Sequence, residues 1–72
     1  MNFDELVSAR MNEQLITHPK HNGVYRLCEP IEGKQPDGTW VMGMVFQDVD
    51  TLTKYWRPIT MFGKFSIWEG GE

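Results

Sequence analysis

Hydrophobic residues near the N-terminus recur at three- and four-residue steps, which is the spacing of one face of an α-helix. These positions are Phe3, Leu6, Val7, Met11 and Leu15. Asn2 can cap the start of such a helix, and Pro19 disfavours the helical conformation for the residue before it. The pattern therefore predicts a helix over residues 2–16.

From Gly23 onward the period changes to two, as it does in β-strands. The alternation predicts strands at 24–29, 40–48, 52–58 and 64–69, with a tight turn or a single 3₁₀ turn at 59–63. Segment 30–39 contains proline and glycine and is predicted to be a loop.

A helix followed by several short strands is typical of an α+β protein. A sheet of so few residues must curl to cover itself. We therefore predict one domain over residues 1–72, with the helix packed on one opening of a small, partly open antiparallel SH3-like β-barrel of four or five strands that spans 23–69.

The segment 40–48 is apolar on both of its faces, although a half-exposed strand should alternate. Trp40, Met42, Met44 and Phe46 share one face, and Val41, Gly43, Val45 and Gln47 share the other. Either the barrel and the helix cover one face each, or one face is a binding surface. Glycine in mid-strand indicates a bulge or a bend at Gly43.

The chain has 72 residues and a formal net charge of −3, with scattered Lys and Arg. Such a composition disfavours binding to a phosphate backbone, which depends on clustered basic residues. Cys28 is the only cysteine, and nothing in its neighbourhood indicates an activated thiolate. His18 and His21 fall short of the four ligands that zinc prefers. We predict a non-enzymatic protein without a cofactor or a metal.

The N-terminus lacks the pattern of a secretory signal, and no apolar run approaches the ~20 residues of a membrane-spanning helix. One free thiol fits a reducing compartment. The sequence predicts a cytoplasmic protein without a membrane segment.

Three Trp, two Tyr and four Phe are more large rings than so small a core needs. Some should therefore be exposed, where aromatic and arginine side chains commonly anchor interfaces. We predict a binding surface made of Trp40, Tyr55, Trp56, Arg57 and Trp68. A protein partner or a second copy of the chain would occupy it. For Arg57 the alternative is an ion pair with Asp48, Asp50 or Glu69.

Two other functions remain open. In a nucleic-acid-binding protein, rings would stack on bases and basic side chains would meet phosphates. The residues for that role are Tyr25, Phe46, Trp56, Arg26, Arg57 and Lys54. In the other alternative, a methionine-lined pocket between the helix and the barrel mouth holds a small molecule.

The segments GVYRL, MVFQD and YWRPITMF resemble a family of short bacterial and phage proteins of unknown function. The family pattern is G-x-Y-R, followed by W-x-R-P-x-x-M-F, and the resemblance covers residues 23–65. This chain departs from it at Tyr55-Trp56 and in the longer loop at 30–38. The resemblance implies a small β-barrel of prokaryotic or phage origin, in which an accessory role on a host protein would be typical.

Overall fold

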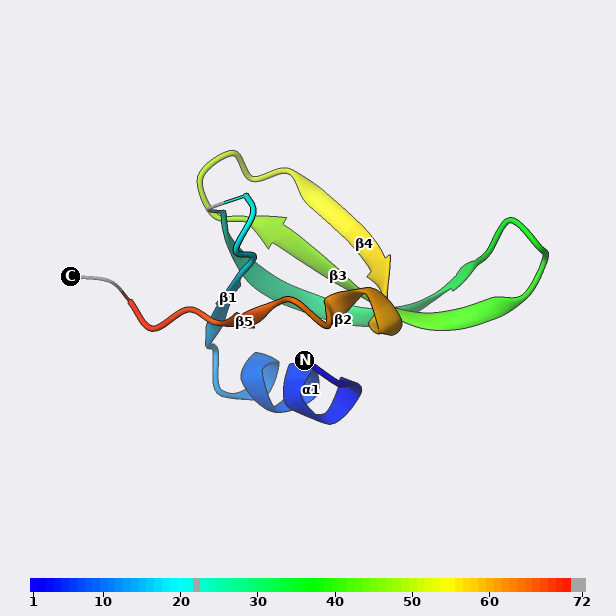
Figure 1. Ribbon diagram of the computed structural model, residues 1–72, viewed down its shortest axis with the longest axis horizontal. Helices are drawn as coiled ribbons and strands as arrows, with labels where there is room; N and C mark the ends of the chain where they lie inside the picture. The colour runs from blue at the N-terminus through cyan, green and yellow to red at the C-terminus, as the bar shows by residue number, and fades with distance from the viewer. Residues whose placement is uncertain (22, 71–72) are drawn as a thin grey trace.

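The computed structural model describes residues 1–21 and 23–70, and it contains one N-terminal helix and a five-stranded antiparallel sheet (Figure 1). The strand order is β4-β3-β2-β1-β5. The elements are α1 (Phe3–Met11), β1 (Leu15–Thr17), β2 (Val24–Lys34), β3 (Trp40–Asp48), β4 (Lys54–Pro58), the 3₁₀ helix η1 (Ile59–Phe62) and β5 (Ser66–Ile67). The predicted α+β class and the turn after β4 are confirmed.

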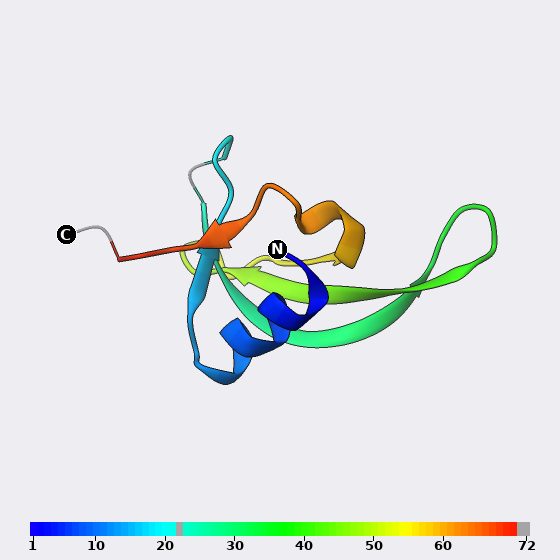
Figure 2. The ribbon, with the colours of Figure 1, turned by 60° about the horizontal axis from the view of Figure 1, so that its bottom comes forward.

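The predicted barrel is not what the structure shows, because the antiparallel sheet does not close into a barrel. β5 pairs with β1, where Ile16 lies opposite Ile67, and β4 pairs with β3. In the described residues no ladder joins β4 to β5, so the sheet keeps two free edges. Closure needs edge strands long enough to hydrogen-bond to each other. β5 has only two residues, and in Figure 2 it lies beside β1.

The start of the helix is as predicted. The side chain of Asn2 accepts a hydrogen bond of 2.8 Å from the Glu5 N–H, and the Glu5 carboxylate accepts one of 2.8 Å from the Asn2 N–H. Such reciprocal bonds satisfy N–H groups that have no partner within the helix. The predicted apolar stripe is correct only in part, because Leu6 is fully buried while Phe3 and Met11 are exposed.

The helix is shorter than the predicted range 2–16, because the chain leaves the helical conformation at Glu13, which has φ of 55°. The N–H of Gln14 donates a 2.9 Å hydrogen bond to the carbonyl of Ala9. This closure is typical of a helix that ends on a left-handed residue. The residues Leu15–Thr17, expected at the end of the helix, form β1 instead.

The predicted loop at 30–39 is also wrong in its first half, where β2 continues to Lys34. Pro30 lies inside this strand opposite Met44. Proline is tolerated there because β1 pairs only with Val24–Arg26, which leaves β2 without a second neighbour farther along. The far half of the β2–β3 hairpin therefore projects from the body as an arm (Figure 1).

The bulge expected at Gly43 lies instead in β2, where the register shifts between Leu27 and Glu29. The carbonyl of Cys28, at the bulge, accepts a hydrogen bond from the Arg10 Nε of α1. The irregularity thus connects the helix to the sheet.

The last two strands are shorter than predicted. β4 begins at Lys54 rather than at residue 52, because Leu52 has a left-handed φ of 65° and ends the preceding turn. β5 covers two residues of the predicted range 64–69. No helix among the described residues is long and apolar enough to span a membrane.

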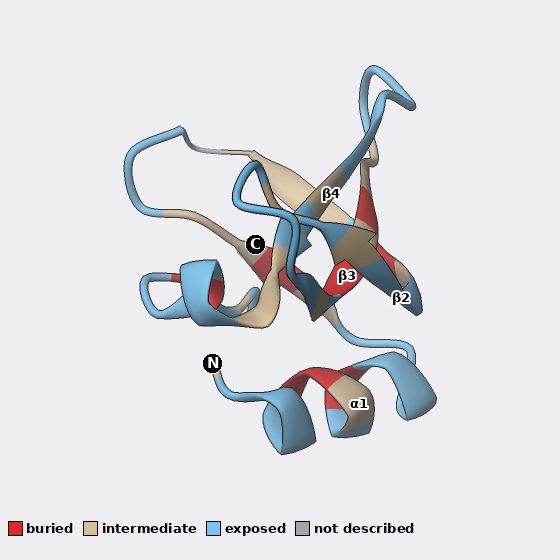
Figure 3. Ribbon diagram, turned by 90° about the vertical axis from the view of Figure 1, so that its right-hand side faces the viewer, coloured by how far each residue is buried: buried red, intermediate tan, exposed pale blue. Residues whose placement is uncertain are grey.

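The core lies between α1, the concave face of the sheet and the segment around η1 (Figure 3). Eight buried side chains form it: Leu6, Ala9, Ile16, Leu27, Met44, Phe46, Phe62 and Phe65. Phe62 and Phe65 pack with ring centroids 4.7 Å apart. They hold the segment after β4 against the sheet, and this placement creates the pocket described next.

Candidate functional site

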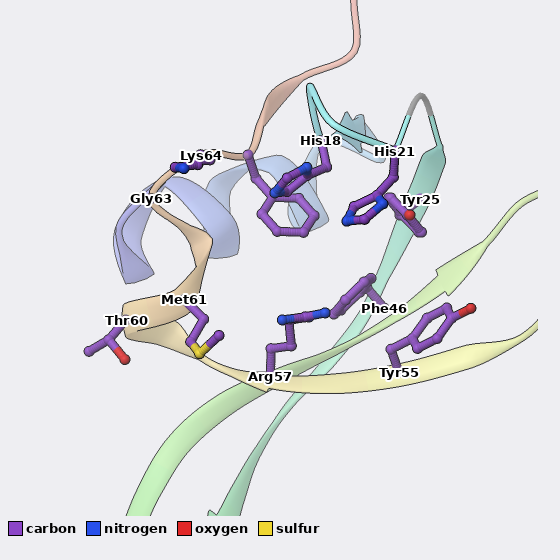
Figure 4. Close-up of a pocket in the computed structure, with 11 residues that line it drawn as sticks. His18, His21, Tyr25, Phe46, Tyr55, Arg57, Thr60, Met61, Gly63 and Lys64 are labelled. Carbon is purple, nitrogen blue, oxygen red and sulfur yellow. The ribbon is translucent and has the colours of Figure 1, made fainter.

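A cavity of about 580 Å³ lies at the open side of the sheet. Its lining comes from β2, β3 and β4, from the segment 60–65 that leads to β5, and from the β1–β2 connection (Figure 4). We call it the seam pocket, because it lies between the edge strand β4 and the segment that leads to the other edge strand, β5. The lining residues are His18, His21, Tyr25, Phe46, Tyr55, Arg57, Thr60, Met61, Gly63, Lys64 and Phe65.

Three aromatic rings from three neighbouring strands form one end of the seam pocket. Phe46 and Tyr55 are cross-strand partners, and their rings stack at 5.5 Å with an interplanar angle of 29°. Tyr25 stands edge-on to both, at 5.2 Å from Phe46 and 6.4 Å from Tyr55. Phe46 is buried, whereas Tyr55 is 44% exposed. Tyr55 therefore offers ring surface to a ligand, and Phe46 supports it from inside.

Tyr25 keeps its place because of a close approach to glycine. A Cβ at residue 23 would lie 2.5 Å from the Tyr25 hydroxyl, so a larger residue than Gly23 would displace the ring. Burial raises the pKa of the Tyr25 phenol, and the nearby carboxylate of Asp48 raises it further. The phenol therefore stays protonated at neutral pH and can donate a hydrogen bond.

Alternation along β4 places Arg57 in the seam pocket. Side chains two apart on a strand share a face, so Arg57 lies on the same side as Tyr55. Arg57 pairs across the sheet with Met44, which faces the core. Lys64 adds a second basic side chain from the segment beyond η1. In Figure 4 the guanidinium lies on the opposite side of the cavity from the two imidazoles.

His18 and His21 extend from the β1–β2 connection, with ring centroids 4.8 Å apart. The Thr17 hydroxyl donates a 2.7 Å hydrogen bond to the Gly23 carbonyl and so ties the two ends of this connection together. The backbone N–H of Lys20 donates to His18 Nδ1 at 3.1 Å. Nδ1 must then be unprotonated, which leaves the His18 Nε2–H as the donor for a ligand.

The charged neighbours of His18 are all basic. Its pKa is lowered chiefly by desolvation and further by the positive charges of His21, Arg57, Lys20 and Lys64. The imidazole is therefore neutral at neutral pH, and the charges around it would attract an anion.

No Asp or Glu is among the described residues that line the seam pocket. Asp48, one of the carboxylates proposed to pair with Arg57, instead accepts the N–H groups of Asp50 and Thr51 at 2.8 and 3.0 Å. A chain with a net charge of −3 thus has a pocket whose charged side chains are positive.

The structure does not bring the five predicted binding residues together. Tyr55 and Arg57 line the seam pocket. Trp40 begins β3 on the projecting arm and is 63% exposed, and Trp68 follows β5 and is 39% exposed. Trp56 lies on the opposite face of β4 from its two neighbours, since alternate side chains point to opposite faces.

Trp56 packs on its own sheet. Its Nε1–H donates a 2.8 Å hydrogen bond to the carbonyl of Ile31 in β2. On the way its ring crosses Gly43 of β3, where a Cβ would lie 2.3 Å from the indole, and it also covers Gly33. The ring therefore covers the backbone at the two glycines, on the face of the hairpin opposite the one that Tyr55 and Arg57 share.

For each of the two alternative functions, the structure brings only some of the proposed residues together. Of the proposed nucleic-acid residues, Tyr25, Phe46 and Arg57 line the seam pocket. A second cavity of about 580 Å³ does lie between α1 and β5, but Met1 is the only methionine among its described lining residues. The chain thus has a cavity near the helix without the predicted methionine lining.

Sequence reasoning did not assign His18, His21 and Lys64 to a binding site. The spacing of His18 and His21 was considered only for zinc, and no local pattern relates the two histidines to Lys64, because the two connections that carry them meet only through packing. Within the described residues, no group of three His, Cys, Asp or Glu comes together that could hold a metal ion.

Comparison of the chain with protein-family models, with curated proteins and with solved structures found no match. The resemblance to the short bacterial and phage family therefore stays a prediction from the sequence.

Proposed function

We propose that this protein is a non-catalytic binding module that takes an anionic group of its partner into the seam pocket. The observation that carries the proposal is the lining itself, in which Arg57 and Lys64 accompany two imidazoles without a described carboxylate. Arginine suits this role because its planar fork can hold a carboxylate or a phosphate through two parallel hydrogen bonds.

The volume and the form of the pocket support a compact ligand. A cavity of about 580 Å³ lies within the range of roughly 300–1,000 Å³ that is typical of ligand sites. The aromatic side chains make part of the lining apolar, and a less polar surrounding strengthens the attraction between a cation and an anion. We keep the likeness to an SH3 fold as a proposal that rests on the strand order, in which β1 to β4 form an antiparallel meander and β5 pairs with β1.

The anion can belong to a protein partner or to a free molecule, whereas a long polyanion is disfavoured. Affinity for a nucleic-acid strand depends on many basic contacts along its backbone. Arg26 and Lys54, which were proposed for such contacts, are not among the described lining residues. Binding to a single-stranded oligonucleotide that far exceeds binding to a mononucleotide, and falls steeply with salt, would favour the nucleic-acid alternative.

The test is a calorimetric or NMR titration of the protein with phenyl phosphate at low ionic strength, for wild type, Arg57→Gln and Arg26→Gln. We expect Arg57→Gln to lose about 10-fold or more in affinity, as hydrogen bonds between charged groups are worth roughly 1.5–3 kcal/mol. Arg26→Gln changes the net charge equally, at an exposed position outside the pocket, and should bind as wild type does. Equal losses in both variants would show that only overall charge matters, and would contradict the proposal.

A further inference from the structure

The walls of the seam pocket are planar on both sides. On one side are Phe46 and Tyr55, on the other side are the imidazoles of His18 and His21, and Tyr25 stands beside His21 (Figure 4). Flat walls favour a flat occupant, because rings gain contact when they stack in offset or edge-to-face arrangements. A saturated, puckered group of equal size makes less contact with such walls.

The planar and the cationic groups occupy different ends of the pocket. In Figure 4 the rings of Tyr25, Phe46 and Tyr55 gather at one end, while Lys64 and Met61 lie at the other. The Arg57 guanidinium lies between the two ends, beside the rings. A ligand that meets both ends therefore needs an apolar ring and an anionic group in one molecule.

We propose that the ligand of the seam pocket is a planar aromatic ring that carries a phosphate or a carboxylate, with the ring against Tyr55 and Tyr25 and the anion at Arg57 and Lys64. This inference rests on the proposed function, which gives the ligand an anionic group, and adds that the ligand carries an aromatic ring. Nucleotides, aryl phosphates, aromatic acids and phosphorylated tyrosine side chains share this chemistry.

The rings are available to a ligand in the folded chain. Tyr55 lies on β4, an edge strand with no sheet neighbour on its outer side among the described residues, and 44% of its surface is exposed. Its inner neighbour Phe46 is 3% exposed and contacts Phe62 and Phe65 in the core. Tyr55 is thus held from one side and open on the other, as a stacking surface requires.

The experiment compares two matched pairs of probes, phenyl phosphate with cyclohexyl phosphate and benzoate with cyclohexanecarboxylate. The members of a pair carry the same anion and differ in whether the ring is flat. We expect the flat member of each pair to bind at least about five-fold tighter, which is the lower end of measured stacking contributions. The Tyr55→Leu variant keeps apolar bulk but removes the flat surface, and it should abolish this preference.

Trp68→Leu is the matched control, because it removes another exposed ring that does not line the seam pocket and should leave the preference unchanged. Circular dichroism and the amide NMR spectrum of each variant establish that it is folded. A peptide with a phosphorylated tyrosine tells the two sources of the ligand apart. If the peptide binds more tightly than phenyl phosphate, the partner is a protein. If the two bind equally, the ligand is a free molecule.

The possible failures are distinguishable. If flat and saturated probes bind equally in an Arg57-dependent way, the inference about the ring is overturned and the anion site stands. The same holds if Tyr55→Leu keeps the preference. If none of the four probes binds to the wild-type protein, the proposed function fails together with the inference.

Discussion

The indole of Trp56 on β4 reaches across β3 and donates a 2.8 Å hydrogen bond to the carbonyl of Ile31 on β2. Three strands are thereby joined by one side chain. Gly33 and Gly43 provide the flat backbone on which the ring lies. Trp56 was predicted to be an interface residue, and in the fold it makes its contacts within the chain.

Replacing Trp56 by Phe should lower the free energy of unfolding by about 1–2 kcal/mol, because the Ile31 carbonyl loses the donor of its hydrogen bond and the smaller ring leaves space. Urea denaturation followed by circular dichroism measures the change. Trp40→Phe is the control, and it should stay within about 0.5 kcal/mol because Trp40 is 63% exposed on the arm. Equal effects of the two substitutions would show that the hydrogen bond contributes nothing.

Gly43→Ala should destabilise the fold by roughly 1–3 kcal/mol, the usual cost of forcing extra atoms into a packed site. The added Cβ would lie 2.3 Å from the indole of Trp56, so the ring must move. In the background of Trp56→Ala the same substitution has no ring to displace, and its cost should largely disappear. A double-mutant cycle in urea measures this coupling. Additive effects of the two substitutions would contradict the proposed contact.

Glu13→Gly should stabilise the protein by about 0.5–1 kcal/mol. Residue 13 has φ of 55°, a conformation that costs a residue with a Cβ more than it costs glycine. Glu13→Ala provides the comparison, because it removes the same charge but keeps the Cβ. Thermal unfolding of the two variants should place the glycine variant above both wild type and the alanine variant. The reverse order would mean that the helix ends differently in solution.

Anion binding at the seam pocket should strengthen as the pH falls. The folded-state pKa of His18 lies below its ordinary value of 6.5, first through desolvation and then through the charges of His21, Arg57, Lys20 and Lys64. A bound anion offsets that repulsion and allows His18 to take up a proton. Between about pH 7.5 and about pH 5.5 we expect affinity to rise roughly two- to five-fold, the effect of one added charge near an anion in an exposed site.

The probe for this measurement is benzenesulfonate, whose own charge does not change in the range. His18→Gln should flatten the pH profile, and a profile that stays steep in this variant would assign the effect to other groups. The stability of the free protein should change in the opposite direction and decrease as the pH falls. Because the folded-state pKa of His18 is lowered, its contribution to stability is present above the ordinary pKa and is lost as the pH falls through the folded value.

Local signals were enough for much of the backbone. The cap at Asn2, the strand at 40–48 and the turn after Pro58 depend on neighbouring residues, and the sequence alone predicted them. The helix at 15–16 and the loop at 30–34 were predicted wrongly because longer-range pairing decided them. Ile16 is buried between β2 and β5, and Pro30 lies where no second strand competes for its edge.

By itself, the sequence determined the class of the protein, its main strand and its excess of aromatic rings over a small core. It also predicted Tyr55 and Arg57 as binding residues, and both line the seam pocket. Only the tertiary structure decided which face of β4 lies in the pocket and that His18 and Lys64 join it. The reason is that these residues come from the β1–β2 connection, from β4 and from the segment after η1, and these parts of the chain meet only through the packing of the fold.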